Sequence, residues 1–136
     1  MNKVVYKASA LPWARTAEGR FHRLVSIKPK TLGLSGVSGT YVIWCSGLKV
    51  DWVYAGASGD LAESIAAAQN DPKIDKFAEK GGLGVTWVAL PAEYRDRVAV
   101  FLRAKLKTQV EEELDSVDPK AEPLVVNLPN DPIQKP

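Results

Sequence analysis

The sequence predicts a small α+β domain in which a three-stranded β-sheet is flanked by helices, with an added N-terminal element. Three patterns indicate this fold class: two β-rich runs around a short loop, two helix-start signals directly after them, and a long run with apolar residues at helical spacing. The 136 residues suit one domain. We divide the chain into a basic extension (residues 1–36), the main domain (37–128) and a Pro-rich tail (129–136).

The two β-rich runs predict a β-hairpin. Residues 40–44 and 51–55 are rich in β-branched and aromatic side chains. The loop between them, residues 45–50, contains Gly47, which suits a turn. We therefore expect the two runs to pair as adjacent strands.

Two helices are expected after the hairpin. The first begins at Asp60 and ends near Asn70, because an Asp followed three residues later by Glu63 is typical of a capping box. The second begins at Asp71, with Pro72 in the first helical position, and ends at Gly81-Gly82.

A third strand and the longest helix complete the predicted domain. Residues 85–90 are apolar enough for a central strand. The helix is expected from Tyr94 to about Asp115. Apolar residues recur there at intervals of three and four, at Val98, Phe101, Leu102, Leu106, Val110 and Leu114. From Val117 onward repeated prolines exclude a helix.

The N-terminal extension is harder to assign. Residues 4–6 and 21–27 each suit a short strand, and interspersed prolines and glycines exclude long helices. Residues 1–30 hold seven Lys and Arg against Glu18, a net charge of +6, whereas residues 31–136 carry −4. Such a basic arm suits nucleic acid or an acidic partner, and it equally suits a solvated terminus.

Composition indicates a soluble protein, which we expect in the cytoplasm. Cys45 is the only cysteine, so no intramolecular disulfide forms and a reducing compartment is favoured. No apolar run approaches the roughly 20 residues of a membrane span, and none at the N-terminus suits a signal peptide. We expect no membrane partner.

Two short motifs mark the ends of the hairpin strands. Gly39-Thr40-Tyr41 opens the first strand, and Val53-Tyr54-Ala55-Gly56 closes the second and continues as Ala57-Ser58-Gly59-Asp60-Leu61 into the helix. Over about residues 37–128 this order and spacing resembles the GIY-YIG nuclease domain superfamily. The closing Pro-x-x-Asn of that family has a loose counterpart in Pro123 and Asn127.

The resemblance implies catalytic positions at Tyr41 and Tyr54 in a metal-dependent phosphodiesterase. The family's arginine position falls on Ser64 and its His or Tyr position on Ala68, and neither residue supplies a positive charge or a proton. We therefore predict a catalytically degenerate member without a cofactor. Mg²⁺ or Mn²⁺ would be required only if nuclease activity persisted.

The family's metal-binding glutamate also lacks a clear counterpart. Spacing counted back from Leu106 gives Arg103, and only Glu111, counted back from Leu114, is a weak candidate. Glu93 and Asp96 flank the start of the helix, where acidic residues favour the helix dipole.

Basic side chains of the extension and the long helix predict a nucleic-acid-binding surface, with tryptophans available to stack on bases. The predicted phosphate-binding residues are Arg20, Arg23, Arg95, Arg97, Arg103, Lys105 and Lys107. The alternative is a solvated helix face balanced by the acidic residues 111–113.

Several of these residues also suit purely structural roles. Tyr41 and Tyr54 fit a cross-strand aromatic pair, and Cys45 fits a small buried hydrophobe. His22, the only histidine, has no companion for a metal site and fits a surface role.

Three functions remain open. The first is a non-enzymatic module that binds DNA, and the second is a protein-interaction or assembly domain without a nucleic-acid partner. The third is an active metal-dependent endonuclease with relocated catalytic groups, for example Arg20 or Arg23 with Glu111.

Overall fold

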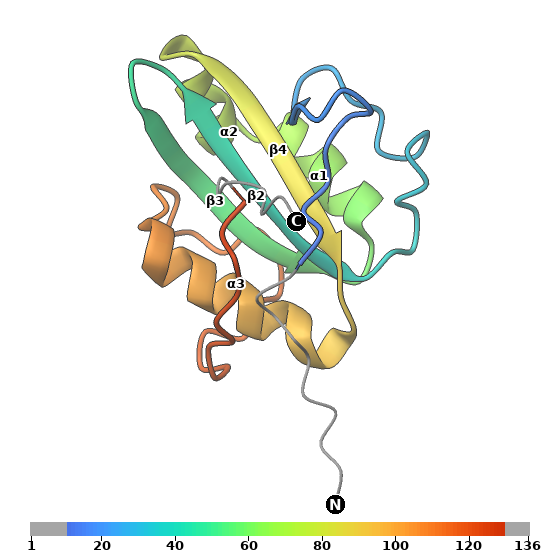
Figure 1. The fold of residues 1–136 in the computed structure, drawn as a ribbon. Coiled ribbons are helices and arrows are strands. Elements are labelled where there is room, and N and C mark those ends of the chain that lie inside the picture. The colour runs from blue at the N-terminus through green and yellow to red at the C-terminus, as the bar shows by residue number, and fades with distance from the viewer. Residues whose placement is uncertain (1–10, 130–136) are drawn as a thin grey trace, which may run out of the picture.

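The computed structural model describes residues 11–129, and its architecture is α+β. One antiparallel sheet of four strands has the order β1-β4-β2-β3, with α3 on one side and α1 and α2 on the other (Figure 1). The elements are β1 (His22–Arg23), β2 (Gly39–Ser46), β3 (Val50–Ser58), α1 (Leu61–Gln69), α2 (Pro72–Asp75), the 3-10 helix η2 (Lys76–Glu79), β4 (Gly82–Ala89) and α3 (Ala92–Leu106).

The sheet has four strands, so the expectation of three was wrong. The added strand is β1, which keeps only two residues of the expected strand 21–27. The chain leaves the sheet early because the backbone N–H groups of Ser26 and Ile27 both turn back to the carbonyl of Arg23, at 3.1 and 3.2 Å. Its position places β4 inside the sheet, as expected. The candidate strand 4–6 lies outside the described residues.

The predicted hairpin is confirmed as β2 and β3, and both strands are longer than expected. The register pairs Tyr41 with Gly56 and Ile43 with Tyr54, then shifts so that Val53 is an extra residue in β3. This bulge allows Val53 and Tyr54 to join the same core cluster. Tyr41 and Tyr54 are therefore diagonal neighbours on one face of the sheet.

Both predicted helix starts are confirmed. The carboxylate of Asp60 accepts the backbone N–H of Glu63 at 3.2 Å, and that of Asp71 accepts the N–H of Lys73 at 2.8 Å. These side chains satisfy N–H groups that a helix start leaves without partners. The second helix is short and continues as η2, which ends just before Gly81.

The longest helix ends at Leu106, so the expected end near Asp115 was wrong. Lys107 adopts a left-handed conformation (φ 54°) and stops the helix. The chain then runs along the free edge of β3, where Gln109 N–H and Val110 N–H each donate at 2.9 Å to the carbonyls of Trp52 and Val53. Tertiary pairing with this strand edge competes with continued helix.

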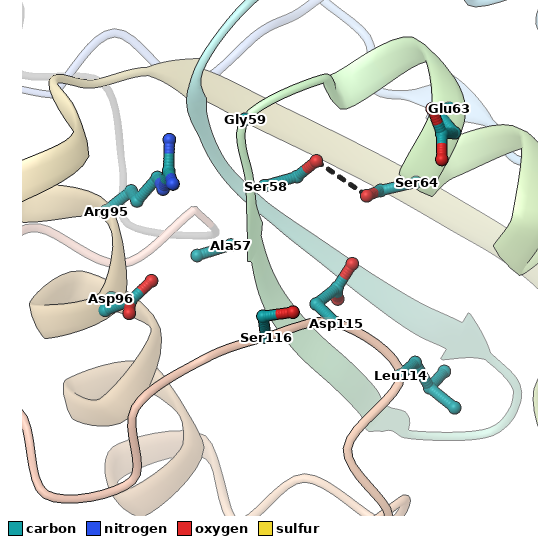
Figure 2. A pocket seen from close by; sticks show the side chains of 10 residues that line it. All are labelled: Ala57, Ser58, Gly59, Glu63, Ser64, Arg95, Asp96, Leu114, Asp115 and Ser116. Carbon is teal, nitrogen blue, oxygen red and sulfur yellow. Dashed lines mark hydrogen bonds between the residues drawn. The ribbon is translucent and has the colours of Figure 1, made fainter.

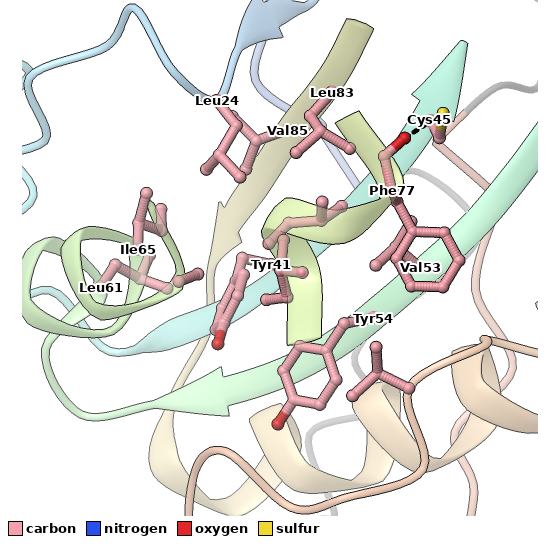
Figure 3. Packing of buried hydrophobic residues seen from close by; sticks show 14 of the residues in the cluster. Leu24, Tyr41, Cys45, Val53, Tyr54, Leu61, Ile65, Phe77, Leu83 and Val85 are labelled. Carbon is pink, nitrogen blue, oxygen red and sulfur yellow. Dashed lines mark hydrogen bonds between the residues drawn. The ribbon is translucent and has the colours of Figure 1, made fainter. Parts of the chain in front are cut away.

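The apolar residues at helical spacing between Val98 and Leu114 pack against both faces of the sheet. Val98 and Leu102 pack on the α3 face, whereas Val110 and Leu114 pack on the opposite face. Figure 3 shows part of that second cluster, where side chains of α1 and η2 cover the sheet. No helix in the described residues has the length and apolar composition of a membrane span.

Candidate functional site

The two motif tyrosines lie side by side at one border of the core. Tyr41 is 1% exposed and Tyr54 is 0% exposed, and their ring centroids are 5.9 Å apart at an interplanar angle of 53°. Both hydroxyls lie at the same end of the packed rings (Figure 3). The expected aromatic contact is thus present, but charged side chains also contact the two hydroxyls.

Asp115 joins the two tyrosines. Its Oδ2 accepts the hydroxyl of Tyr41 at 2.7 Å and that of Tyr54 at 2.8 Å. Gly56 makes this approach possible, since a Cβ there would lie 2.7 Å from Tyr54 Cε2, 2.9 Å from Tyr41 Cε1 and closer still to Asp115 Oδ2. The motif glycine therefore leaves the space in which the carboxylate sits.

Arg103 reaches the same place from α3. Its Nε donates to the carbonyl of Ala55 at 2.7 Å, which is accessible because β3 is an edge strand. One guanidinium nitrogen then donates to Tyr54 Oη at 3.0 Å, and two donate to the carboxylate of Glu113 at 2.8 and 2.9 Å. Such a bidentate Arg–carboxylate pair is among the stronger hydrogen-bonded contacts in proteins.

These five residues, Tyr41, Tyr54, Arg103, Glu113 and Asp115, are called the tyrosine–carboxylate cluster below. The Tyr54 hydroxyl is its centre, because it also accepts the backbone N–H of Leu114 at 3.2 Å and lies 2.9 Å from Glu113 Oε1. A phenol has a single hydrogen, so Tyr54 donates to one of the two carboxylates at a time.

The environment keeps both phenols neutral. Burial and the neighbouring carboxylate of Asp115 raise the pKa of Tyr41 and of Tyr54 above the ordinary 10.0. Burial alone would raise the pKa of Glu113, but hydrogen bonds and charge from Arg103 outweigh it and hold that pKa below 4.5. The pKa of Arg103 is raised by Glu113 and Tyr54 against the opposing effect of burial.

This chemistry suits hydrogen-bond donation better than attack on phosphorus. A tyrosine that serves as nucleophile or base at neutral pH needs a lowered pKa, and both phenols are shifted in the other direction. The divalent metal implied by the resemblance does not fit the donors either. Within residues 11–129 no three His, Cys, Asp or Glu side chains gather as a metal site, and Glu113 is engaged by Arg103.

A polar pocket of about 370 Å³ adjoins the cluster at Asp115 (Figure 2). Arg95 and Asp96 of α3 line one side, and Glu63 and Ser64 of α1 line the other. Its remaining lining residues are Ala57, Ser58, Gly59, Leu114, Asp115 and Ser116. Three acidic residues against one arginine make its lining net acidic, which disfavours a phosphate group there.

The positions at which the resemblance expects further catalytic groups lie apart from the cluster. Ser64 lines the pocket and donates to Ser58 Oγ at 2.6 Å, and Ala68 is buried under the sheet. Glu111, the weak metal candidate, is an exposed residue of the segment after α3. It has no hydrogen bond or ion pair to the cluster among the described residues.

The predicted phosphate-binding residues form separate groups. Arg103 is engaged in the cluster, Arg95 donates to Ser38 Oγ at 2.9 Å, and Arg97 donates to the carbonyl of Glu122 at 2.9 Å. The remaining four, Arg20, Arg23, Lys105 and Lys107, are exposed. Arg20 and Arg23 lie at the β1 edge of the sheet, whereas Lys105 and Lys107 lie where α3 ends and the chain turns onto the β3 edge.

A basic surface gathers around β1 instead. Residues 20–30, called the basic segment below, hold Arg20, Arg23, Lys28 and Lys30, all exposed. No acidic residue occurs from residue 19 to residue 50, and none of the four side chains forms an ion pair with another described residue. The segment borders α1, since Gln69 donates to the carbonyls of Leu24 and Ile27 at 2.7 and 2.8 Å.

The tryptophans, His22 and Cys45 lie mostly in surroundings that suit a structural role. Trp13 and Trp44 are buried, and Trp44 packs against Trp52 at 5.7 Å between centroids. His22, which is part of the basic segment, stacks on Trp87, with centroids 4.9 Å apart. Cys45 is buried, and burial raises its thiol pKa, which suits the expected role of a small core residue.

Glu113 and Asp115 are site residues that sequence reasoning missed. Their sequence pattern suits the acidic balance of a solvated helix face and the end of one long helix, and it gives no reason to place either residue near Tyr41 and Tyr54. The sequence offered one chemical signal: Arg103 stands at one of the positions where the resemblance would place an acid, and a buried arginine there needs an acidic partner from elsewhere in the chain. No protein-family model, curated protein or solved structure gives a significant match to this chain.

Proposed function

We propose that this chain is a non-enzymatic, GIY-YIG-like domain that binds nucleic acid through the basic segment. The observation that carries the proposal is the exposed, uncompensated charge of Arg20, Arg23, Lys28 and Lys30 beside β1. Unpaired lysines and arginines displace condensed counterions from a phosphate backbone, and this release drives binding.

The basic segment is a better phosphate-binding surface than α3. Three of the five basic residues expected on α3 donate hydrogen bonds within the protein. The segment that follows α3 carries the exposed acids Glu111 and Glu112, which oppose the attraction of Lys105 and Lys107 for phosphate.

The non-enzymatic part of the proposal rests on the tyrosine–carboxylate cluster. Its phenols are held neutral and donate to carboxylates, and its arginine is neutralised by Glu113. Incubation of a DNA duplex with the protein in Mg²⁺ or Mn²⁺ tests this part. Cleavage that disappears in the Tyr54→Phe variant would establish the nuclease alternative instead.

Fluorescence anisotropy of a labelled DNA duplex, titrated at several salt concentrations, tests the binding part. Four phosphate contacts predict a slope of log affinity against log salt of about −3.6. The matched variants R20Q/R23Q and K105Q/K107Q each remove two positive charges. The first should reduce the slope by about 2, and the second should leave it nearly unchanged. Equal effects of both pairs would contradict the assignment to the basic segment.

A protein-interaction domain is the second candidate, because large apolar side chains are exposed at the β2–β3 hairpin tip. Leu48 is fully exposed and Val50 is 48% exposed. A partner protein that covered this hairpin tip would remove both apolar side chains from water, which favours association. Absence of DNA binding even at low salt would favour this candidate.

A further inference from the structure

The tyrosine–carboxylate cluster has the composition of an anion-binding site that already holds an anion. The donors are the hydroxyls of Tyr41 and Tyr54 and the guanidinium of Arg103. The acceptors are the carboxylates of Glu113 and Asp115, both carried by one short segment after α3. The site is therefore filled from within the chain.

The donors are set in place by the fold itself. Both tyrosines are fully buried in the sheet's core cluster, yet their hydroxyls meet at its border. Arg103 is fixed by its bond to the Ala55 carbonyl, and Gly56 leaves the space between the rings. These donors belong to β2, β3 and α3, whereas the acceptors belong to a segment outside the helices and strands.

We infer that the segment from Glu113 to Asp115 is an intramolecular plug, whose two carboxylates fill a site that would otherwise accept a phosphate group. Three carboxylate oxygens take the donated hydrogen bonds, Asp115 Oδ2 and both oxygens of Glu113. A phosphate dianion presents three unprotonated oxygens and carries the same total charge as the two carboxylates. It also pairs with arginine in a bidentate manner.

This inference does not depend on the basic segment. The plugged site lies at the β3 edge, and the basic segment lies at the β1 edge. Loss of one binding function therefore leaves the other measurable.

The test is removal of the plug with the double variant E113A/D115A, followed by titration with inorganic phosphate in a calorimeter at constant ionic strength. The variant should bind phosphate at least about tenfold more tightly than the wild type, because each added arginine–phosphate bond is a strong charge-assisted one. The control E111A/E112A removes the same charge from the same segment without touching the cluster, and it should behave as the wild type. Equal affinities of all three proteins would overturn the inference.

A third substitution locates the binding. Adding Arg103→Gln to E113A/D115A should abolish the gain, whereas adding R20Q/R23Q should not. A gain that survives Arg103→Gln would place the phosphate elsewhere and overturn the inference. A dinucleotide with one phosphodiester, titrated in the same way, distinguishes a nucleic-acid backbone from free phosphate as the anion accepted.

The inference can be tested even if the variant E113A/D115A does not fold by itself. If E113A/D115A is unfolded in chloride, phosphate at the same ionic strength should restore the fold by replacing the lost carboxylates. Far-ultraviolet circular dichroism measures this recovery. A variant that stays unfolded in phosphate would show that the carboxylates are structural only.

Discussion

The carboxylate of Asp115 fills the space that a side chain at Gly56 would need. The carboxylate oxygen Oδ2 of Asp115 lies where a side chain at position 56 would project, and there it accepts the hydroxyls of Tyr41 and Tyr54. The position therefore requires glycine for a packing reason, since no positive φ is involved.

The substitution Gly56→Ala should lower the free energy of unfolding by at least about 2 kcal/mol, because the added methyl collides with two rings and a carboxylate in a packed core. Urea denaturation measures the loss. Gly82→Ala is the matched control, since a Cβ at that strand position meets no atom within 4 Å. A cost for Gly56→Ala no larger than that of the control would contradict this account.

Asn127 holds the two ends of the described chain together. Its amide accepts the N–H of Leu11 at 2.8 Å and donates to the carbonyl of Leu11 at 3.1 Å. Asn127→Ala leaves both backbone groups without these partners and should cost about 2 kcal/mol. Asn70→Ala, which loses one exposed bond to the Ala66 carbonyl, should cost less than about 0.5 kcal/mol in the same thermal unfolding measurement.

The raised pKa values of Tyr41 and Tyr54 predict loss of stability in alkali. The folded state favours the neutral phenols, so their contribution is fully present below pH 10.0 and is lost as pH rises through their higher folded-state pKa values. Near-ultraviolet absorbance of tyrosinate should show phenols that ionise late in the native protein and at the ordinary pH in urea. Tyr41→Phe and Tyr54→Phe should each remove one late phenol. A native titration identical to that in urea would refute the prediction.

The lowered pKa of Glu113 predicts the opposite dependence in acid. Its stabilising contribution is present above pH 4.5 and is lost as pH falls through the lower folded-state pKa. Glu113→Gln should cost about 1 kcal/mol at pH 6, a value reduced by the partial exposure of the pair, and the cost should shrink towards pH 2. Urea denaturation across this range measures both, and Glu111→Gln serves as the control with little cost at pH 6. A cost for Glu113→Gln that is independent of pH would argue against the ion pair.

The left-handed Lys107 predicts a stabilising substitution. Glycine adopts this conformation without the steric cost that a Cβ brings, so Lys107→Gly should raise the free energy of unfolding by about 0.5 kcal/mol. Lys105→Gly, inside α3, should instead lower it by about 1 kcal/mol. Thermal unfolding separates the two, and a loss in both would show that Lys107 is not a helix stop.

The parts of the fold predicted from sequence depend on residues close together in the chain. The carboxylate of Asp60 caps α1 by accepting the backbone N–H of Glu63, three residues along the chain, and residues 45–50 contain the hairpin turn, so local physical chemistry was sufficient. The convergence of Tyr41 and Tyr54 also followed from strand pairing, although the bulge at Val53 that keeps Tyr54 on this face was not foreseen.

Only the tertiary structure decided where α3 ends and which charges meet the tyrosines. A periodic apolar pattern does not distinguish residues on one helix face from residues that pack on two faces of a sheet, so the pattern predicts a helix through Val110 and Leu114 where the structure has none. Tyr41 and Asp115 are 74 residues apart, and Arg103 reaches Tyr54 across 49. Such contacts arise because the free edge of β3 captures the chain after Leu106, and only the assembled sheet presents that edge.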